Sequence, residues 1–159
     1  MVVDVSAGLA TAGNGSRIVP PLAEAASHDR RFITLLNGFR SSGGLHRLAM
    51  TQAIRRHAWS AEVIDALPAR VAGRGVLGIT WNHETWVPDF QFDGRGTTKQ
   101  PVAAVLLELV PSHDPWDLAT WWVAPSTWLQ HARPIDLLEM APDRVFAAAR
   151  ADRYIARGG

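Results

Sequence analysis

The prolines of the last third of the chain constrain its fold more than any other feature. Six prolines lie within 42 residues, and a run with the spacing of a short amphipathic helix follows nearly every one of five of them: Pro101, Pro115, Pro125, Pro134 and Pro142. Proline suits the first position of a helix because its φ angle is already helical and its missing N–H would have no partner there. The region from 101 to 155 is therefore predicted to be a compact bundle of short helices with sharp corners.

The residues before this region predict further helices. A short helical run follows Pro20 and Pro21, and Asp29 is expected to cap a second helix whose apolar side carries Phe32, Leu35, Leu36 and Phe39. A third helix is predicted from Leu45 to about His57. Ser60 is expected to cap a fourth, which Pro68 should end because the residue before a proline avoids the helical region.

Between the two helical regions the apolar period changes from 3.6 to 2. Leu77, Ile79 and Trp81 share one face of the first predicted strand, within 76–81. The second, within 85–93, has one aromatic-rich face formed by Trp86, Pro88, Phe90 and Phe92. We interpret this segment as a β-hairpin whose aromatic face packs on the helices.

The predicted fold class is mainly α, with N-terminal helices that loosely resemble a helix-turn-helix, one β-hairpin and the proline-started bundle. We expect a flexible tail over residues 1–28, a helical region over 29–75, and a hairpin with a helical domain over 76–159. The chain has 159 residues, 47% of them apolar, which is enough to bury a core without cross-links.

Composition narrows the class of function. The formal net charge is +1, so any nucleic-acid site must be a local patch. The chain has no cysteine, which excludes disulfides and thiolate metal sites. No apolar stretch is long enough for a transmembrane helix, and the first residues lack the pattern of a secretory signal. We expect a cytoplasmic protein that does not associate with membranes.

No enzyme signature is recognisable. The six histidines are scattered, and none pairs at helical spacing in a metal-binding motif. His83 and Glu84 fall in a predicted turn, and the glycines around Arg74 and Arg95 do not lead from a strand into a helix. We therefore expect no catalytic residue, no metal and no cofactor.

The helices around residues 45–67 have the length of a helix-turn-helix. The alternative is a pair of packed core helices. The reader helix would carry Glu62 and Asp65 and no basic residue, so phosphates would repel it. Five arginines remain as candidates for contacts with the phosphates of a DNA backbone: Arg47, Arg55, Arg56, Arg70 and Arg74.

The seven tryptophans can serve the core or an interface. The core is the default for Trp122 and Trp128. Trp121 lies about 100° from the apolar stripe of its helix, which makes it a candidate exposed anchor beside the Arg133-Pro134 corner.

Several segments together resemble the Xre/MbcA/ParS-type antitoxins, in particular their C-terminal toxin-binding domain. The resemblance covers residues 76–152 and is carried by the following runs: VLGI, PDFQFD, PVAAVLLEL, DPWDLATWWVAPSTWL, RPIDLL and PDRVFAAAR.

The resemblance implies an antitoxin of a type II toxin–antitoxin system, which neutralises a RES-domain toxin that consumes NAD by covering its active site. It also implies repression of its own operon, and assembly as a homodimer or as a hetero-oligomer with the toxin. A DNA-binding regulator without a toxin partner is the alternative. The residues expected to meet the toxin are Trp121, Trp128, Arg133, Pro134, Arg150, Arg153 and Arg157.

Overall fold

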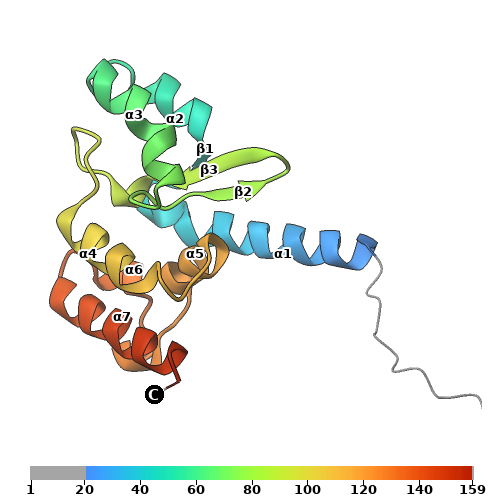
Figure 1. Cartoon of the computed structure of the whole chain (residues 1–159), viewed down its shortest axis with the longest axis vertical. Coiled ribbons are helices and arrows are strands. Elements are labelled where there is room, and N and C mark those ends of the chain that lie inside the picture. Colours follow the sequence, from blue (N-terminus) through green and yellow to red (C-terminus); the bar gives the residue numbers. More distant parts are fainter. Residues whose placement is uncertain (1–20, 159) are drawn as a thin grey trace, which may run out of the picture.

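The computed structural model describes residues 21–158. Within them the fold is mainly helical with one small antiparallel sheet, as the sequence predicts (Figure 1). The helices are α1 (Pro21–Phe39), α2 (Leu48–Arg55), α3 (Ala61–Ala72), α4 (Gln100–Leu109), α5 (Pro115–Val123), α6 (Pro134–Leu137) and α7 (Pro142–Ala156). The strands are β1 (Leu45–Arg47), β2 (Ile79–Trp81) and β3 (Glu84–Pro88).

The proline-started helices are confirmed. Proline occupies one of the first two positions of α4, α5, α6 and α7. Asp114 caps α5 by accepting a hydrogen bond of 2.8 Å from the backbone N–H of Asp117. Pro125 instead precedes a short 3-10 helix, Thr127–Leu129. The corners follow from proline geometry and from side-chain caps, which act within a few residues of the chain.

The sheet has a third strand that the sequence did not reveal. The predicted hairpin exists as β2 and β3, joined by Asn82 and His83, which both adopt positive φ angles. The strand order is β1-β3-β2. Leu45–Arg47 was predicted to begin a helix but pairs antiparallel with β3, so α2 starts only at Leu48. Long-range pairing overrides the local helical pattern here, because it buries Leu45 and satisfies the backbone.

Both faces of the sheet are covered, whereas only one apolar face was expected. Leu77, Ile79 and Phe90 join the large core formed with α1, α4, α5 and α7. Val87, on the opposite face, packs in a second cluster beneath α3 together with Trp59 and other apolar residues. Phe92 also lies in this second cluster, because a 3-10 turn at Asp89–Gln91 breaks the period of two.

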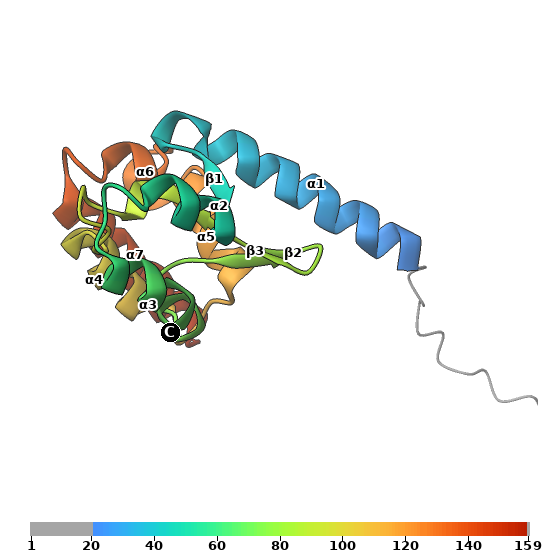
Figure 2. The ribbon, with the colours of Figure 1, turned by 90° about the horizontal axis from the view of Figure 1, so that it is seen from above.

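Helix α1 is continuous from Pro21 to Phe39, so the predicted break at Asp29 is wrong. Asp29 lies inside the helix, and its carboxylate accepts a hydrogen bond of 3.1 Å from Trp81 Nε1. Residues 21–28, expected to belong to a flexible tail, form its first turns, and residues 1–20 lie outside the described part. Figures 1 and 2 show that the first half of α1 extends beyond the remainder of the fold.

Helix α3 continues past Pro68 to Ala72, and the predicted end at Leu67 is wrong. Proline in a helix interior leaves the carbonyl four residues earlier without its N–H partner. That carbonyl belongs to Ile64, and Gln52 Nε2 donates to it at 3.1 Å. A side chain from α2 thus replaces the missing backbone bond and allows the helix to continue.

The two predicted structured regions, 29–75 and 76–159, share one core. Phe32, Leu35 and Phe39 of α1 pack in the same cluster as Trp122 and Val145, and β1 pairs with β3 across the proposed boundary. None of the helices within residues 21–158 combines the length and apolarity that a membrane span requires.

Candidate functional site

Trp121 and Trp128 meet at one carboxylate. Trp121 Nε1 donates to Asp152 Oδ2 at 2.7 Å, and Trp128 Nε1 donates to Asp152 Oδ1 at 2.8 Å. Trp121 is half-buried against the core, whereas Trp128 is 50% exposed. The expectation that Trp128 belongs to the core is therefore wrong. Trp122, expected in the core, is fully buried.

The segment that carries Trp128 is fixed by its own hydrogen bonds. The backbone N–H of Ser126 donates to Ala132 O at 3.0 Å, and the Ser126 carbonyl accepts from His131 N at 2.8 Å. Gln130 and His131 hold positive φ angles of 56° and 65°, which cost free energy in residues other than glycine. The fixed loop and the Asp152 bond together hold an exposed indole in one orientation, as a binding anchor requires.

The predicted arginines of α7 form a separate cluster. Arg150, Arg153 and Arg157 line an open hollow of about 460 Å³ together with Tyr154 and Glu108. Arg153 is paired with Glu108 at 2.8 Å. Since successive helical residues are 100° apart, this hollow and Asp152 lie on different sides of α7. Arg150 and Arg157 are exposed and make no ion pair within residues 21–158.

The Arg133-Pro134 corner is engaged within the chain. Both carboxylate oxygens of Asp136 accept from Arg133 at 2.6 Å, and Arg133 Nη1 donates to Gly38 O at 3.3 Å. The Arg133 hydrogen bonds lower the pKa of Asp136, and the same contact raises the pKa of Arg133. Pro134 is buried. This corner joins α6 to the end of α1.

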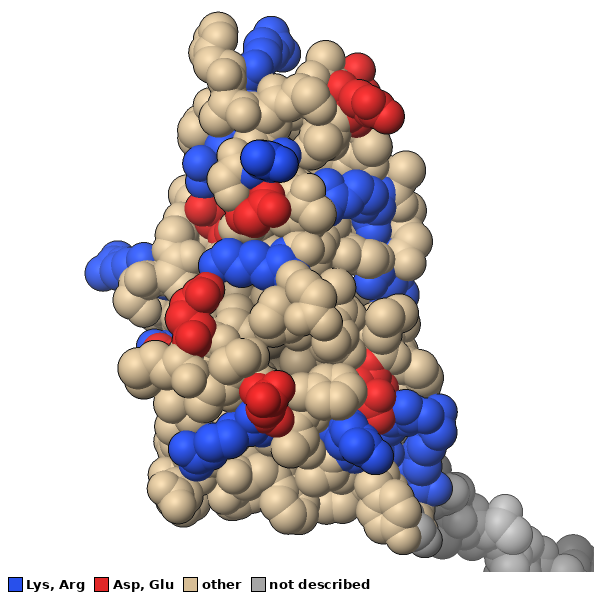
Figure 3. All heavy atoms as spheres, turned by 90° about the vertical axis from the view of Figure 1, so that its left-hand side faces the viewer, with Lys and Arg blue, Asp and Glu red and all other residues tan. Residues whose placement is uncertain are grey.

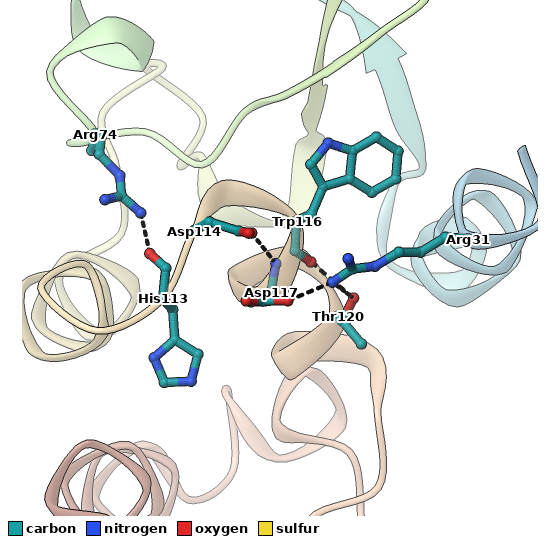
Figure 4. A network of polar contacts seen from close by, with 7 residues as sticks. All are labelled: Arg31, Arg74, His113, Asp114, Trp116, Asp117 and Thr120. Carbon is teal, nitrogen blue, oxygen red and sulfur yellow. Dashed lines mark hydrogen bonds and ion pairs between the residues drawn. The ribbon is translucent and has the colours of Figure 1, made fainter. Parts of the chain in front are cut away.

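Arg74, a candidate DNA contact, instead binds backbone carbonyls of the segment that joins α4 to α5. Its guanidinium donates to Val110 O at 3.0 Å. It also donates to the carbonyl of His113, immediately before the capped start of α5 (Figure 4). On the other side of that helix, Arg31 of α1 pairs with Asp117 at 2.6 Å. The two arginines hold the first turn of α5 from opposite directions.

Two further candidate arginines pair with acids of the sheet region. Arg47 contacts Glu84 at 2.6 Å, and Arg55 donates two hydrogen bonds of 2.7 Å to Asp89. Glu84, which follows His83 in the predicted turn, is thus paired with Arg47. Among residues 21–158, no three metal-binding side chains converge.

Arg70 is also held within the fold, by Gly96 O and Thr98 Oγ1 at 2.8 Å each. Burial lowers the pKa of Arg70. Arg56 alone of the five is exposed and forms no ion pair within the described residues. Contacts within the fold already engage four of the five guanidinium groups, which makes them less available to phosphates than a free arginine.

The distribution of charged side chains also argues against DNA binding. Glu62 and Asp65 are exposed on α3, the helix that would read DNA. On the face shown in Figure 3, Lys and Arg side chains alternate with Asp and Glu and do not gather into one basic surface. A backbone-binding protein needs such a surface, because phosphate contacts supply most of its affinity.

Asp152 is the functional candidate that sequence reasoning missed. It follows Trp121 by 31 positions and Trp128 by 24, so no local spacing links it to either indole. The only signal is an acidic residue on the same side of the last helix as Val145 and Ala149.

Scans of protein-family models, of curated proteins and of solved structures found no match to this chain.

Proposed function

We propose that this chain is the antitoxin of a type II toxin–antitoxin system, a non-enzymatic cytoplasmic protein that binds a RES-type toxin and covers its NAD site. The motif resemblance over residues 76–152 motivates the proposal. The structural observation that supports it best is Trp128, half-exposed and oriented by Asp152. Tryptophan and arginine are the residue types that most often dominate protein–protein affinity.

The arginine hollow supplies the second contact of the proposal. Arg150 and Arg157 are free to meet anionic groups, and Tyr154 offers an amphipathic ring between them. NAD carries two phosphates, and guanidinium groups bind phosphates, so these arginines can pair with NAD held in the toxin's site. The hollow and Trp128 lie on different sides of α7, and the side of Asp152 is packed on the core through Val145 and Ala149. We therefore propose that the toxin contacts the hollow and Trp128 at two separate places.

The test is coexpression with a neighbouring RES-domain gene, followed by copurification and growth rescue. Trp128→Ala should weaken toxin binding at least 30-fold, which corresponds to about 2 kcal/mol for a dominant contact. Leu107→Ala is the matched control, since Leu107 is a 79% exposed apolar residue on α4 that does not line the arginine hollow. No copurification, or equal affinities of the two variants, would overturn the proposal.

The alternative, a DNA-binding regulator, has weaker support because Arg47, Arg55, Arg70 and Arg74 are engaged within the fold. A gel-shift assay with the chain's own promoter separates the two functions. Tight binding that Arg56→Glu abolishes would favour the regulator and autorepression. If the chain does not bind the promoter at physiological salt, the regulator is excluded and only the antitoxin proposal stands.

A further inference from the structure

The first half of α1 is uncovered within the described chain. Residues 22–30 are all exposed, and Leu22 is 85% exposed. The first contacts with other elements are made by His28, whose ring lies 5.9 Å from that of Trp116, and by Asp29. Helical turns without tertiary packing are marginal in water. A helix extending this far from the fold therefore calls for a surface to pack against (Figure 2).

One side of α1 carries a stripe suited to such packing. At 100° per residue, Leu22, Ala26, Ile33, Asn37 and Arg40 lie within about 60° of one another. Ile33 is 55% exposed at the centre of this stripe. At its far end, the stripe borders an open hollow of about 440 Å³ between α1 and β1, whose floor includes Gly43 to His46.

We propose that a second copy of this chain covers the stripe, with the two α1 helices packed antiparallel about a two-fold axis at Ile33. At 1.5 Å per residue, Leu22 lies about 16 Å from Ile33, and Arg40 lies about 10 Å away in the other direction. Leu22 of each copy therefore reaches just past Arg40 of the other, into the hollow at Gly43 and Gly44. Ala26, which faces Arg40 in this arrangement, is small enough for close approach.

Charge favours a second copy over an unrelated partner. Asp29 precedes Ile33 by four positions and Arg40 follows it by seven, so antiparallel packing brings Asp29 of one copy within about one turn of Arg40 of the other. The symmetry makes this pair twice. Arg40 is exposed and has no ion-pair partner within residues 21–158, and one oxygen of Asp29 remains free beside the Trp81 bond. A self-complementary patch of this kind is what a two-fold interface requires.

The absence of cysteine allows a direct test on the full chain. Ile33→Cys should form an intermolecular disulfide under mild oxidation, because the two-fold axis places equal positions side by side. Leu107→Cys, at a more exposed position on α4, should not. Sedimentation of the unmodified chain should give twice the 17.4 kDa of one copy. A monomer at all concentrations, or equal cross-linking of the two variants, would overturn the dimer.

A charge swap tests the orientation. Arg40→Asp should weaken dimerisation at least fivefold by facing Asp29 with a like charge, and Asp29→Arg combined with Arg40→Asp should restore it. Far-UV circular dichroism checks that each variant stays folded. Dimerisation unaffected by Arg40→Asp, or not restored by the double change, would refute the antiparallel register. The dimer does not depend on toxin binding, since Trp128→Ala should leave it intact.

Discussion

Replacing Asp152 tests whether one carboxylate orients the exposed tryptophan. Asp152→Ala removes the acceptor of two indole N–H groups, at 2.7 and 2.8 Å. Hydrogen bonds to charged groups contribute about 1.5–3 kcal/mol each when partly buried. Trp121 is half-buried and should lose most of that amount, while Trp128 can bond water instead. We expect the free energy of unfolding to fall by about 2–3 kcal/mol.

Asp152→Asn sharpens this test because its shape is almost unchanged. An amide offers one oxygen acceptor, and its NH₂ group faces the second indole donor, so one of the two bonds is lost. The expected cost is about 1–2 kcal/mol. Arg150→Ala is the control, since Arg150 is exposed on the same helix and makes no ion pair within the described chain.

Urea denaturation followed by circular dichroism measures these free energies. In the proton–nitrogen spectrum, the indole N–H signals of Trp121 and Trp128 should shift in both Asp152 variants and stay in place in the control. If Asp152→Ala costs less than about 0.5 kcal/mol, as expected of a surface change, and both indole signals stay in place, the carboxylate does not orient Trp128. The proposal that Trp128 is a preoriented binding anchor would then be refuted.

Two further predictions concern local chemistry. Gln52→Ala should lower the free energy of unfolding by about 1 kcal/mol, because it leaves Ile64 O unpaired. In a Pro68→Ala background the same change should cost much less, since residue 68 would then supply the missing N–H. If the two changes are additive in a double-mutant cycle measured by denaturation, this explanation is wrong. The pKa of Asp136 is lowered by Arg133, so its contribution to stability is present above about pH 4, the range of a free Asp, and is lost as pH falls through the folded pKa. Asp136→Asn should therefore flatten the acid limb of a stability–pH curve, and an unchanged limb would refute the assignment.

The chain's local chemistry determined much of the helical region. The starts of α4, α5, α6 and α7 follow from proline geometry, and the cap at Ser60 was predicted and found. These devices act over three or four residues, so the sequence alone contains the complete cause. The apolar stripe of α1 likewise identifies buried side chains such as Phe32, Leu35 and Phe39.

Only the tertiary structure decided the features that join distant residues. Leu45 has the spacing of a helix, yet becomes strand because β3 offers a partner. Pro68 should end α3, yet Gln52 supplies the missing donor. Trp128 is held in one orientation at the surface by Asp152. In each case the deciding group lies 12 or more positions away, and its position depends on the packed fold rather than on the neighbouring sequence.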